Sequence, residues 1–385
     1  MDLIERIERP GQKKLLAIDG GGIRGVLALG MLKKIEDTLK TQSGRDTFRL
    51  ADYFDYIGGT STGAIIATGL SIGMSIDHIL EFYTDSGAQM FARANPLKWL
   101  WYSFKAAPLA NKLREVFGAD TTFGSPKVRT LLMMVMRNAT TDSPWPLSNN
   151  PYAKYNNAPD RPDDNLKFPL WQLVRASTAA PTYFPPEVIV LTNPDKTKEK
   201  KFVFVDGGMT MYNNPAFQMF LMATLDGYWP KAPHKRWKTG VADMLIVSVG
   251  TGTTPNVRTG LDPRAMHLLY NARTIPSVLM FAAQNEQDQL CRIFGKCLAG
   301  ELLDREIGDL LDNAGPLEPA EKLFTYLRYD AELTREGLDK LGFPDIKPKT
   351  VQKLDSVKGI PDLWKVGTKV GEQVKPEHFA GFPAT

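Results

Sequence analysis

A serine between two glycines, in the sequence Gly59-Thr60-Ser61-Thr62-Gly63, is the strongest candidate for chemistry in this chain. It follows an apolar run, Phe54 to Ile57, and precedes a very apolar stretch, Ala64 to Ile72. In a nucleophile elbow the serine lies on a tight turn between a strand and a helix, and the glycines let the backbone pass closely. The N-terminus of the helix also favours negative charge on the serine oxygen. The pattern therefore predicts a nucleophile at Ser61.

A glycine-rich turn closer to the N-terminus, Asp19-Gly20-Gly21-Gly22-Ile23-Arg24-Gly25, follows the apolar run Leu15 to Ile18. Alone, it fits a dinucleotide fingerprint as well as an oxyanion hole built from the N–H groups of Gly20, Gly21 and Gly22. A dinucleotide site would require an acidic residue closing the next strand, about 20 residues further on. Glu36 and Asp37 lie instead inside the helix-like stretch Val26 to Leu39. Beside the serine motif, the oxyanion interpretation is favoured.

A serine hydroxyl also needs a base, and the chain offers two candidates. Asp206 ends the apolar run Phe202 to Val205 and precedes Gly207-Gly208, so it lies at a strand end, where α/β folds gather their active sites. Its carboxyl group would need a pKa raised by burial to act as a base. His267 is the one histidine of four placed late enough to complete a serine–acid–histidine order, although it lies in a helix-like run.

Three functions are compatible with these residues. One is a hydrolase with a Ser61–Asp206 dyad, in which Gly59, Gly63, Gly207 and Gly208 shape the two turns. A second is a Ser–His–Asp esterase that uses His267 on soluble esters. The third is a nucleotide-binding module in which the turn from Gly20 to Gly25 holds a phosphate and the serine elbow is inert.

The elements that must position these residues are short apolar strands alternating with helices. Val128 to Met136 and Met244 to Val249 are further strand candidates, and glycines at the strand ends favour a mainly parallel sheet in an α/β fold. We expect a catalytic domain over residues 14–255 and a helical extension over 256–341 packed on the same domain. Residues 342–385 are rich in Lys, Pro and Gly, which predicts a loosely packed tail.

Composition excludes several classes of protein. Of the 385 residues, 43% are hydrophobic and 23% charged, and the net charge of +4 is far from that of a protein that binds nucleic-acid polymers. Two cysteines, Cys291 and Cys297, cannot form a disulfide framework or a structural zinc site. The N-terminus is charged, and no window approaches the roughly 18 apolar residues of a membrane span. We expect a cytoplasmic protein, at most peripheral at the inner membrane face.

Residues Asn95 to Phe117 mix aromatic and basic side chains, including Trp99, Trp101 and Lys105. This composition suits a segment at a membrane interface. It equally suits a helix that packs its aromatic side chains against the main sheet, or a lid over an acyl pocket. The sequence does not separate these three interpretations.

Taken together, the motifs resemble the patatin-like phospholipase family, whose pattern is a DGGGxRG turn, a GxSxG elbow and a later DG[AG]. Here these are Asp19 to Gly25, Gly59 to Gly63, and Asp206 to Gly208, in that order, and Arg175 to Phe184 resembles the stretch between elbow and aspartate. The resemblance implies a three-layer α/β fold with a mainly parallel central sheet flanked by helices, followed here by C-terminal helical additions. It also implies no metal and no other cofactor.

Carried over to this sequence, the resemblance implies a lipid acyl hydrolase of the phospholipase A or lysophospholipase type. Ser61 would be the nucleophile, Asp206 the base and Gly20 to Gly22 the oxyanion hole, while Arg24 would brace that loop or meet a substrate phosphate. The expected partner is a phospholipid or other acyl lipid at a membrane surface. Some bacterial members are antiviral effectors switched on by a cyclic nucleotide, and the similar size and composition of this chain suggest such an activator.

Overall fold

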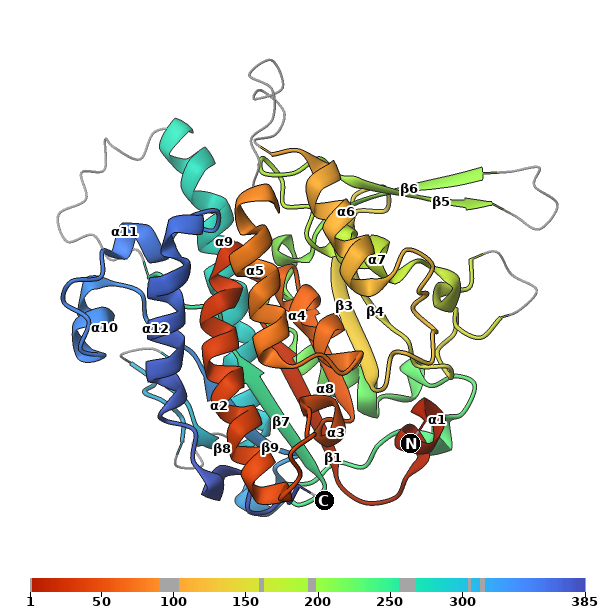
Figure 1. The fold of residues 1–385 in the computed structure, drawn as a ribbon. Helices are drawn as coiled ribbons and strands as arrows, with labels where there is room; N and C mark the ends of the chain where they lie inside the picture. The colour runs from red at the N-terminus through yellow and green to blue at the C-terminus, as the bar shows by residue number, and fades with distance from the viewer. Residues whose placement is uncertain are drawn as a thin grey trace.

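The chain forms one mixed sheet with helices on both faces (Figure 1). The computed structural model describes residues 2–90, 104–158, 163–192, 199–255, 268–303, 306–311 and 316–384. The strand order is β5-β6-β3-β2-β1-β7-β9-β8, and β4 also pairs with β3. The strands are β1 (Lys13–Ile18), β2 (Tyr56–Thr60), β3 (Leu131–Asn138), β4 (Ser143–Ser148), β5 (Glu187–Thr192), β6 (Glu199–Asp206), β7 (Met244–Val249), β8 (Lys296–Ala299) and β9 (Thr325–Tyr329). The pairs among β1, β2, β3, β7, β8 and β9 are parallel, whereas β4, β5 and β6 pair antiparallel.

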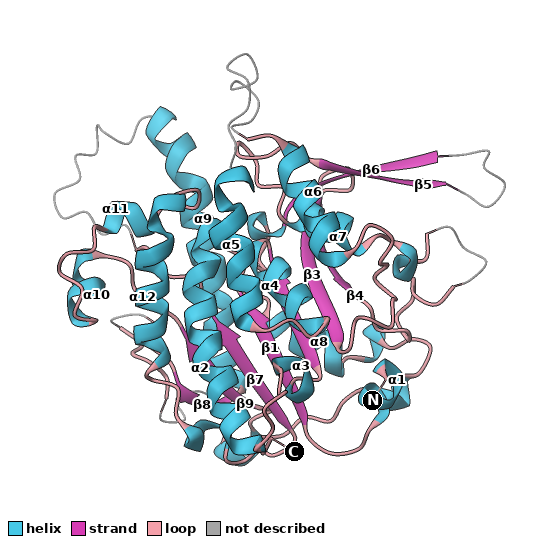
Figure 2. Ribbon diagram, viewed as in Figure 1, coloured by secondary structure: helices cyan, strands magenta, loops and turns pink. Residues whose placement is uncertain are grey.

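The helices cover the sheet in two layers (Figure 2). They are α1 (Leu3–Glu8), α2 (Gly25–Ser43), α3 (Leu50–Tyr53), α4 (Thr62–Ser71), α5 (Ile76–Met90), α6 (Ala106–Phe117), α7 (Leu170–Ser177), α8 (Ala216–Thr224), α9 (Leu268–Phe294), α10 (Arg335–Lys340), α11 (Pro348–Val351) and α12 (Ile360–Gly371). One apolar cluster joins the sheet to α2, α4, α5, α6, α7 and α12, and a second joins the opposite face to α8 and α9. The predicted α/β fold with a mostly parallel central sheet is therefore confirmed.

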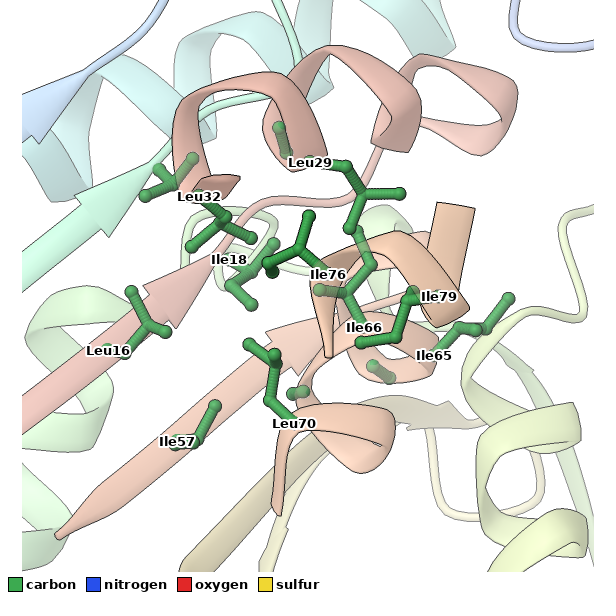
Figure 3. Packing of buried hydrophobic residues seen from close by; sticks show 14 of the residues in the cluster. Leu16, Ile18, Leu29, Leu32, Ile57, Ile65, Ile66, Leu70, Ile76 and Ile79 are labelled. Carbon is green, nitrogen blue, oxygen red and sulfur yellow. The ribbon is translucent and has the colours of Figure 1, made fainter. Parts of the chain in front are cut away.

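Strand β1 shows why the sheet is buried on both sides. Leu16 and Ile18 belong to the first cluster, whereas Leu15 and Ala17 belong to the second, because successive side chains of a strand point to opposite faces. Figure 3 shows Leu16 and Ile18 in one group of apolar side chains with Leu29 and Leu32 of α2 and with Ile66 and Leu70 of α4. The last four residues of β1, Leu15 to Ile18, are apolar and fully buried, and the C-terminal end of the strand delivers the glycine-rich turn to one edge of the sheet.

The prediction of a helical extension over residues 256–341 is wrong in part. Helix α9 lies there, but β8 and β9 follow it and extend the sheet beyond β7. The sequence of β9, Thr-Tyr-Leu-Arg-Tyr, mixes polar and apolar residues. It is nevertheless fully buried because its arginine is neutralised inside the protein, as described below. The proposed boundaries at residues 14 and 255 remain predictions.

The prediction of a loosely packed tail over 342–385 is also wrong. Helix α12 buries Leu363, Val366 and Val370 in the main core, and it packs along α2. The two helices approach closely because glycines face each other: a Cβ on Gly367 would lie 2.1 Å from the carbonyl oxygen of Leu27. Small residues allow backbones to approach in this way, so the glycine content reflects tight packing here.

The three interpretations of Asn95 to Phe117 are partly resolved. Residues 95–103 lie outside the described part of the chain, and most of the remainder forms α6. This helix buries Leu109, Leu113 and Phe117 in the core, which favours the packed-helix interpretation for that half. Within the described residues, no helix is both long enough and apolar enough to cross a membrane.

Candidate active site

Ser61 lies on a strained turn between β2 and α4. Its φ of 55° and ψ of −120° fall in a region that non-glycine residues rarely adopt. The two flanking glycines are required by contact: a Cβ on Gly59 would lie 2.1 Å from the carbonyl carbon of Gly63, and a Cβ on Gly63 would lie 2.2 Å from the carbonyl oxygen of Ile18. The predicted elbow is thus present, and it holds the serine side chain at the N-terminus of α4.

Asp206 ends β6 and meets Ser61 directly. The Ser61 hydroxyl donates a hydrogen bond of 2.6 Å to Oδ2 of Asp206, and Oδ1 of Asp206 accepts the N–H of Gly208 at 2.7 Å. The turn that follows the strand is the 3₁₀ helix Gly207–Met209, and a Cβ on Gly207 would lie 2.2 Å from the carbonyl oxygen of Val135. Two residues 145 positions apart in the sequence therefore form one hydrogen-bonded pair.

Ser177 supports this pair, although sequence reasoning gave it no role. Its hydroxyl accepts the N–H of Ser61 at 2.9 Å and donates to the carbonyl of Val135 at 2.5 Å. This links the elbow to β3, the strand that pairs with Asp206 through Met136. Ser177 lies in the stretch from Arg175 to Phe184, and the resemblance of this stretch to the family is the sequence signal that points to it.

Burial sets the protonation behaviour of Asp206. Loss of solvent raises the pKa of its carboxyl group to about 6, while the hydrogen bonds from Ser61 and Gly208 and the charge of Arg175 oppose that rise. Arg175 is itself fully buried, and burial lowers its pKa. Its guanidinium donates to the carbonyl of Pro185 at 2.8 Å. Asp206 therefore has the raised pKa that a carboxylate needs in order to act as a base.

We expect activity to depend on the ionisation of Asp206. Only the carboxylate accepts the serine proton, so kcat/KM on a neutral ester should be half-maximal near pH 6 and constant above about pH 7. Below that midpoint the rate should fall about tenfold per pH unit, because the protonated fraction grows tenfold per unit. A pH profile from 4.5 to 8.5 measures this. A rate that does not change between pH 5 and 7 would contradict it.

The structure of the glycine-rich loop contradicts one of the three predicted oxyanion donors. The N–H of Gly20 donates to the carbonyl of Asn213 at 3.0 Å, so it is not available to a substrate oxygen. Gly21 and Gly22 line the same cavity as Ser61, and within the described part of the chain their N–H groups make no hydrogen bond. The carbonyl of Leu354 accepts the N–H of Ile23 at 2.8 Å and fixes the end of the loop. Two of the three glycines predicted to form the oxyanion hole therefore line the cavity and have N–H groups without another partner among the described residues.

The N-termini of two helices meet beside this loop. Helix α2 begins at Gly25 and α4 begins at Thr62, and a Cβ on Gly25 would lie only 2.4 Å from the Thr62 hydroxyl. The partial positive charge at helix N-termini favours an anion. The fold thus places a favourable field where negative charge would develop on a reacting ester.

A buried ion network holds the loop from behind, and sequence reasoning missed it. Arg328 of β9 donates to both carboxylate oxygens of Asp19, at 3.0 and 2.7 Å, and to Asp330 at 2.6 Å. Gln284 of α9 also donates to Asp19, at 3.1 Å. Burial raises the pKa of Asp19 to about 6, and the charge of Arg328 opposes that rise. No local pattern links these positions, since Asp19 and Arg328 are 309 residues apart.

Arg24 lies in the short 3₁₀ helix Gly22–Arg24, behind the loop. It is buried and does not line the cavity, and its Nε has no hydrogen-bond partner within the described residues. Burial lowers its pKa to about 10, while the carboxylates of Asp330 and Asp19 oppose that change. Because Arg24 does not line the cavity, this position does not support contact with a substrate phosphate, and the bracing of the loop stays a prediction.

The cavity above Ser61 and Asp206 is mainly apolar and has a volume of about 370 Å³. Ile65 and Leu109 form part of its wall, and Phe184, Met209 and Met280 form another. Such a lining suits an acyl chain, and a volume in this range is typical of small-molecule sites. Among the described residues, no group of three or more His, Cys, Asp or Glu side chains is placed to hold a metal ion.

The histidines do not form part of this cavity in the described part of the chain. His78 and His234 are exposed, and His378 forms a hydrogen bond of 2.7 Å with the hydroxyl of Tyr329. None of the three lines the cavity. His267, the alternative base, lies outside the described residues.

Comparisons with known proteins match the same region of the chain. Residues 16–220, more than half of the chain, match the model of the patatin-like phospholipase family. Patatin-17 of Solanum cardiophyllum is 30% identical over 247 residues, covering 62% of this chain and 60% of its own. A cGAMP-activated phospholipase of Vibrio cholerae is 29% identical over 257 residues, covering 62% of this chain and 64% of its own.

A third relative is an intracellular phospholipase A2 of Caenorhabditis elegans, 30% identical over 253 residues, which cover 64% of this chain and 20% of the relative. The chain thus spans less than two thirds of the length of these relatives. The matched residues include the glycine-rich loop, the serine elbow and the aspartate that together line the cavity. This chain belongs to the patatin-like phospholipase family.

Proposed function

We propose that this protein is a lipid acyl hydrolase in which Ser61 is the nucleophile and Asp206 the base. The observation that carries the proposal is the 2.6 Å hydrogen bond from the Ser61 hydroxyl to Asp206 at the floor of an apolar cavity. A hydroxyl that donates to a buried carboxylate of raised pKa is oriented for proton transfer. Family membership supports the same chemistry.

The reaction follows from these positions in two steps. Asp206 takes the hydroxyl proton as the Ser61 oxygen attacks the ester carbonyl, and the N–H groups of Gly21 and Gly22 stabilise the resulting oxyanion. The protonated Asp206 then gives its proton to the leaving alcohol, which yields an acyl-serine. In the second step Asp206 takes a proton from water, the hydroxide attacks the acyl-serine, and the proton returns to Ser61 as the fatty acid leaves.

We propose phospholipid at a membrane surface as the substrate, with the protein acting from the surface of the bilayer. The apolar cavity supports an acyl chain, and three relatives named as phospholipases support the substrate class. We also propose a cyclic nucleotide activator. Its support is that two bacterial relatives, 29% and 28% identical to this chain, are cGAMP-activated phospholipases.

The test is fatty acid release from mixed phosphatidylethanolamine and phosphatidylglycerol vesicles in EDTA, with and without cyclic GMP–AMP. We expect release that requires Ser61, and a fluorophosphonate probe should label wild type but not Ser61→Ala. Labelling without release would reject the phospholipid substrate while keeping the activated serine. If wild type shows neither fatty acid release nor labelling, with or without the nucleotide, the proposal that the protein is a hydrolase would be rejected.

A further inference from the structure

A second cavity, of about 720 Å³, shares no lining residue with the cavity above Ser61. It lies along β4 and the loop 149–158 that follows it. The first residues of β2 and β3, the 3₁₀ helix Asp226–Tyr228 and the ribbon of β5 and β6 complete its walls. A volume of this size is within the range of about 300–1,000 Å³ that is typical of ligand sites. The proposed hydrolase reaction makes no use of it.

Aromatic rings form much of the lining of this cavity. They belong to Tyr56, Trp145, Tyr155, Phe202 and Tyr228. Aromatic rings that border a cavity can stack on planar heterocycles, as they stack on bases in nucleic-acid complexes. The lining therefore favours a ligand with a planar ring system.

Positive charge lies beside these rings. The Lys154 ammonium is 5.3 Å from the ring centre of Tyr155, and the Lys200 ammonium is 5.1 Å from that of Phe202. Neither lysine forms an ion pair within the described part of the chain, while one carboxylate, Asp163, also lines the cavity. Two lysines without ion pairs favour an anionic group on the ligand.

One buried hydroxyl lies in the wall of the cavity. The Tyr56 side chain is 1% exposed, and its hydroxyl interacts with the side chain of Ser148, which lines the same cavity. Burial raises the pKa of Tyr56, so the hydroxyl stays protonated and can donate a hydrogen bond to an acceptor atom of a ligand.

The loop of this cavity is built to hold its shape. The Asn156 amide donates to the carbonyls of Ser148 and Asn150, both at 2.7 Å, and accepts from Asn165 at 2.8 Å. These bonds are buried or partly buried, so they fix the backbone opposite the rings. The cavity is therefore bounded by a hydrogen-bonded wall on that side.

From these features we propose that the second cavity binds a nucleotide, with its base stacked on the aromatic side chains and its phosphate near Lys154 and Lys200. This deepens the proposed function, because it gives the activator proposed above a site. Neither the stacking surface nor the charge depends on Ser61, so binding and hydrolysis can be tested separately.

Strand β6 connects the second cavity to the reacting pair. Lys200 and Phe202 line the cavity, and Asp206 ends the same strand on the same face, since these positions alternate with period two. Across the sheet, Trp145 pairs with Met136, and Met136 pairs with Asp206. The Trp145 ring centre lies 5.0 Å from that of Phe204. A ligand stacked on Trp145 would thus act on the strand that positions the base.

Calorimetry with Ser61→Ala protein tests the site without hydrolysis. The probes are cyclic GMP–AMP, AMP and GMP, with adenosine and inorganic phosphate measured separately. We expect at least one nucleotide to bind, and adenosine and phosphate to bind at least about tenfold more weakly. Lys200→Gln should weaken nucleotide binding at least about tenfold, because a charge-assisted hydrogen bond is lost. Lys201→Gln, its neighbour on β6 that does not line the cavity, should leave binding unchanged.

Tyr56→Phe provides an independent test. The variant keeps the ring for stacking but removes the hydroxyl that can donate to the ligand, so nucleotide binding should weaken several-fold. No binding by any of the three nucleotides would overturn the proposal, as would equal losses in Lys200→Gln and Lys201→Gln. If Ser61→Ala binds a nucleotide but wild type hydrolyses no lipid, the nucleotide site is supported and the proposed hydrolase function is rejected.

Discussion

Asp206→Asn should lower kcat/KM for ester hydrolysis by about 10³-fold, within the range of roughly 10²–10⁴-fold that general bases contribute. The asparagine keeps the shape of the side chain and can still accept the N–H of Gly208, but its amide does not take a proton from Ser61. Labelling of Ser61 by a fluorophosphonate should slow by a similar factor. Because a buried charge is removed, the free energy of unfolding should not fall.

Asp55→Asn is the matched control, since Asp55 is equally buried but precedes β2 at the opposite end of the strand. Its carboxylate lies 3.3 Å from Arg9 and accepts the N–H of Lys14 at 3.0 Å. Asp55→Asn should lower the free energy of unfolding, whereas the folded variant should keep its kcat. Asp206→Asn should show the opposite pattern. If Asp206→Asn keeps wild-type activity, the dyad is wrong and His267→Ala is the next variant.

Arg328→Met should destabilise the protein by about 3–5 kcal/mol, the usual result of leaving buried charges without their partner. The change would remove the bonds to Asp19 and Asp330 and a bond of 2.7 Å to the Ser248 hydroxyl. Urea unfolding at pH 7.5 measures the loss. Burial already raises the pKa of Asp19 in the folded state, and without the charge of Arg328 it should rise further above the unfolded value. The loss should therefore shrink as the pH falls to 5.5 and the Asp19 carboxyl group takes up a proton.

Arg236→Met is the control for that experiment. Arg236 pairs with Asp226, but both side chains are largely exposed, so the pair should contribute within about 1 kcal/mol. If Arg236→Met and Arg328→Met lower the free energy of unfolding by the same amount, the buried ion network contributes no more to stability than an exposed ion pair. Circular dichroism before unfolding checks that Arg328→Met still folds.

The sequence predicts the reacting pair because each member carries its own local signal. Ser61 and Asp206 each follow an apolar run and lie next to glycines, which marks both as residues at strand ends. The sequence does not reveal that β6 runs antiparallel to β3, so that Asp206 reaches Ser61 through its pairing with Met136. The same reasoning assigned three oxyanion donors, whereas Gly20 donates to Asn213. That bond depends on a distant loop, which no local pattern reveals.

The ion network and the C-terminal segment were missed for a related reason. Arg328 lies in the short strand β9, whose sequence mixes polar and apolar residues. Its charge can be buried because Asp19 and Asp330 form ion pairs with it in the folded protein. Gly367 in α12 lowers helix propensity, but it allows contact with α2. In both cases the energy comes from a partner far along the chain, which composition and periodicity do not reveal.

The carbonyl of Leu354 that fixes the glycine-rich loop has a consequence for biosynthesis. The serine, the aspartate and all their sheet neighbours through β7 are made before residue 250, but the loop receives this bond only about a hundred residues later. Helix α12, which packs along α2 just behind the loop, is made later still. A nascent chain would therefore hold both reacting side chains without a fixed oxyanion loop. With the proposed hydrolase reaction, this order of synthesis would keep the nascent chain inactive until the residues beyond 350 have folded.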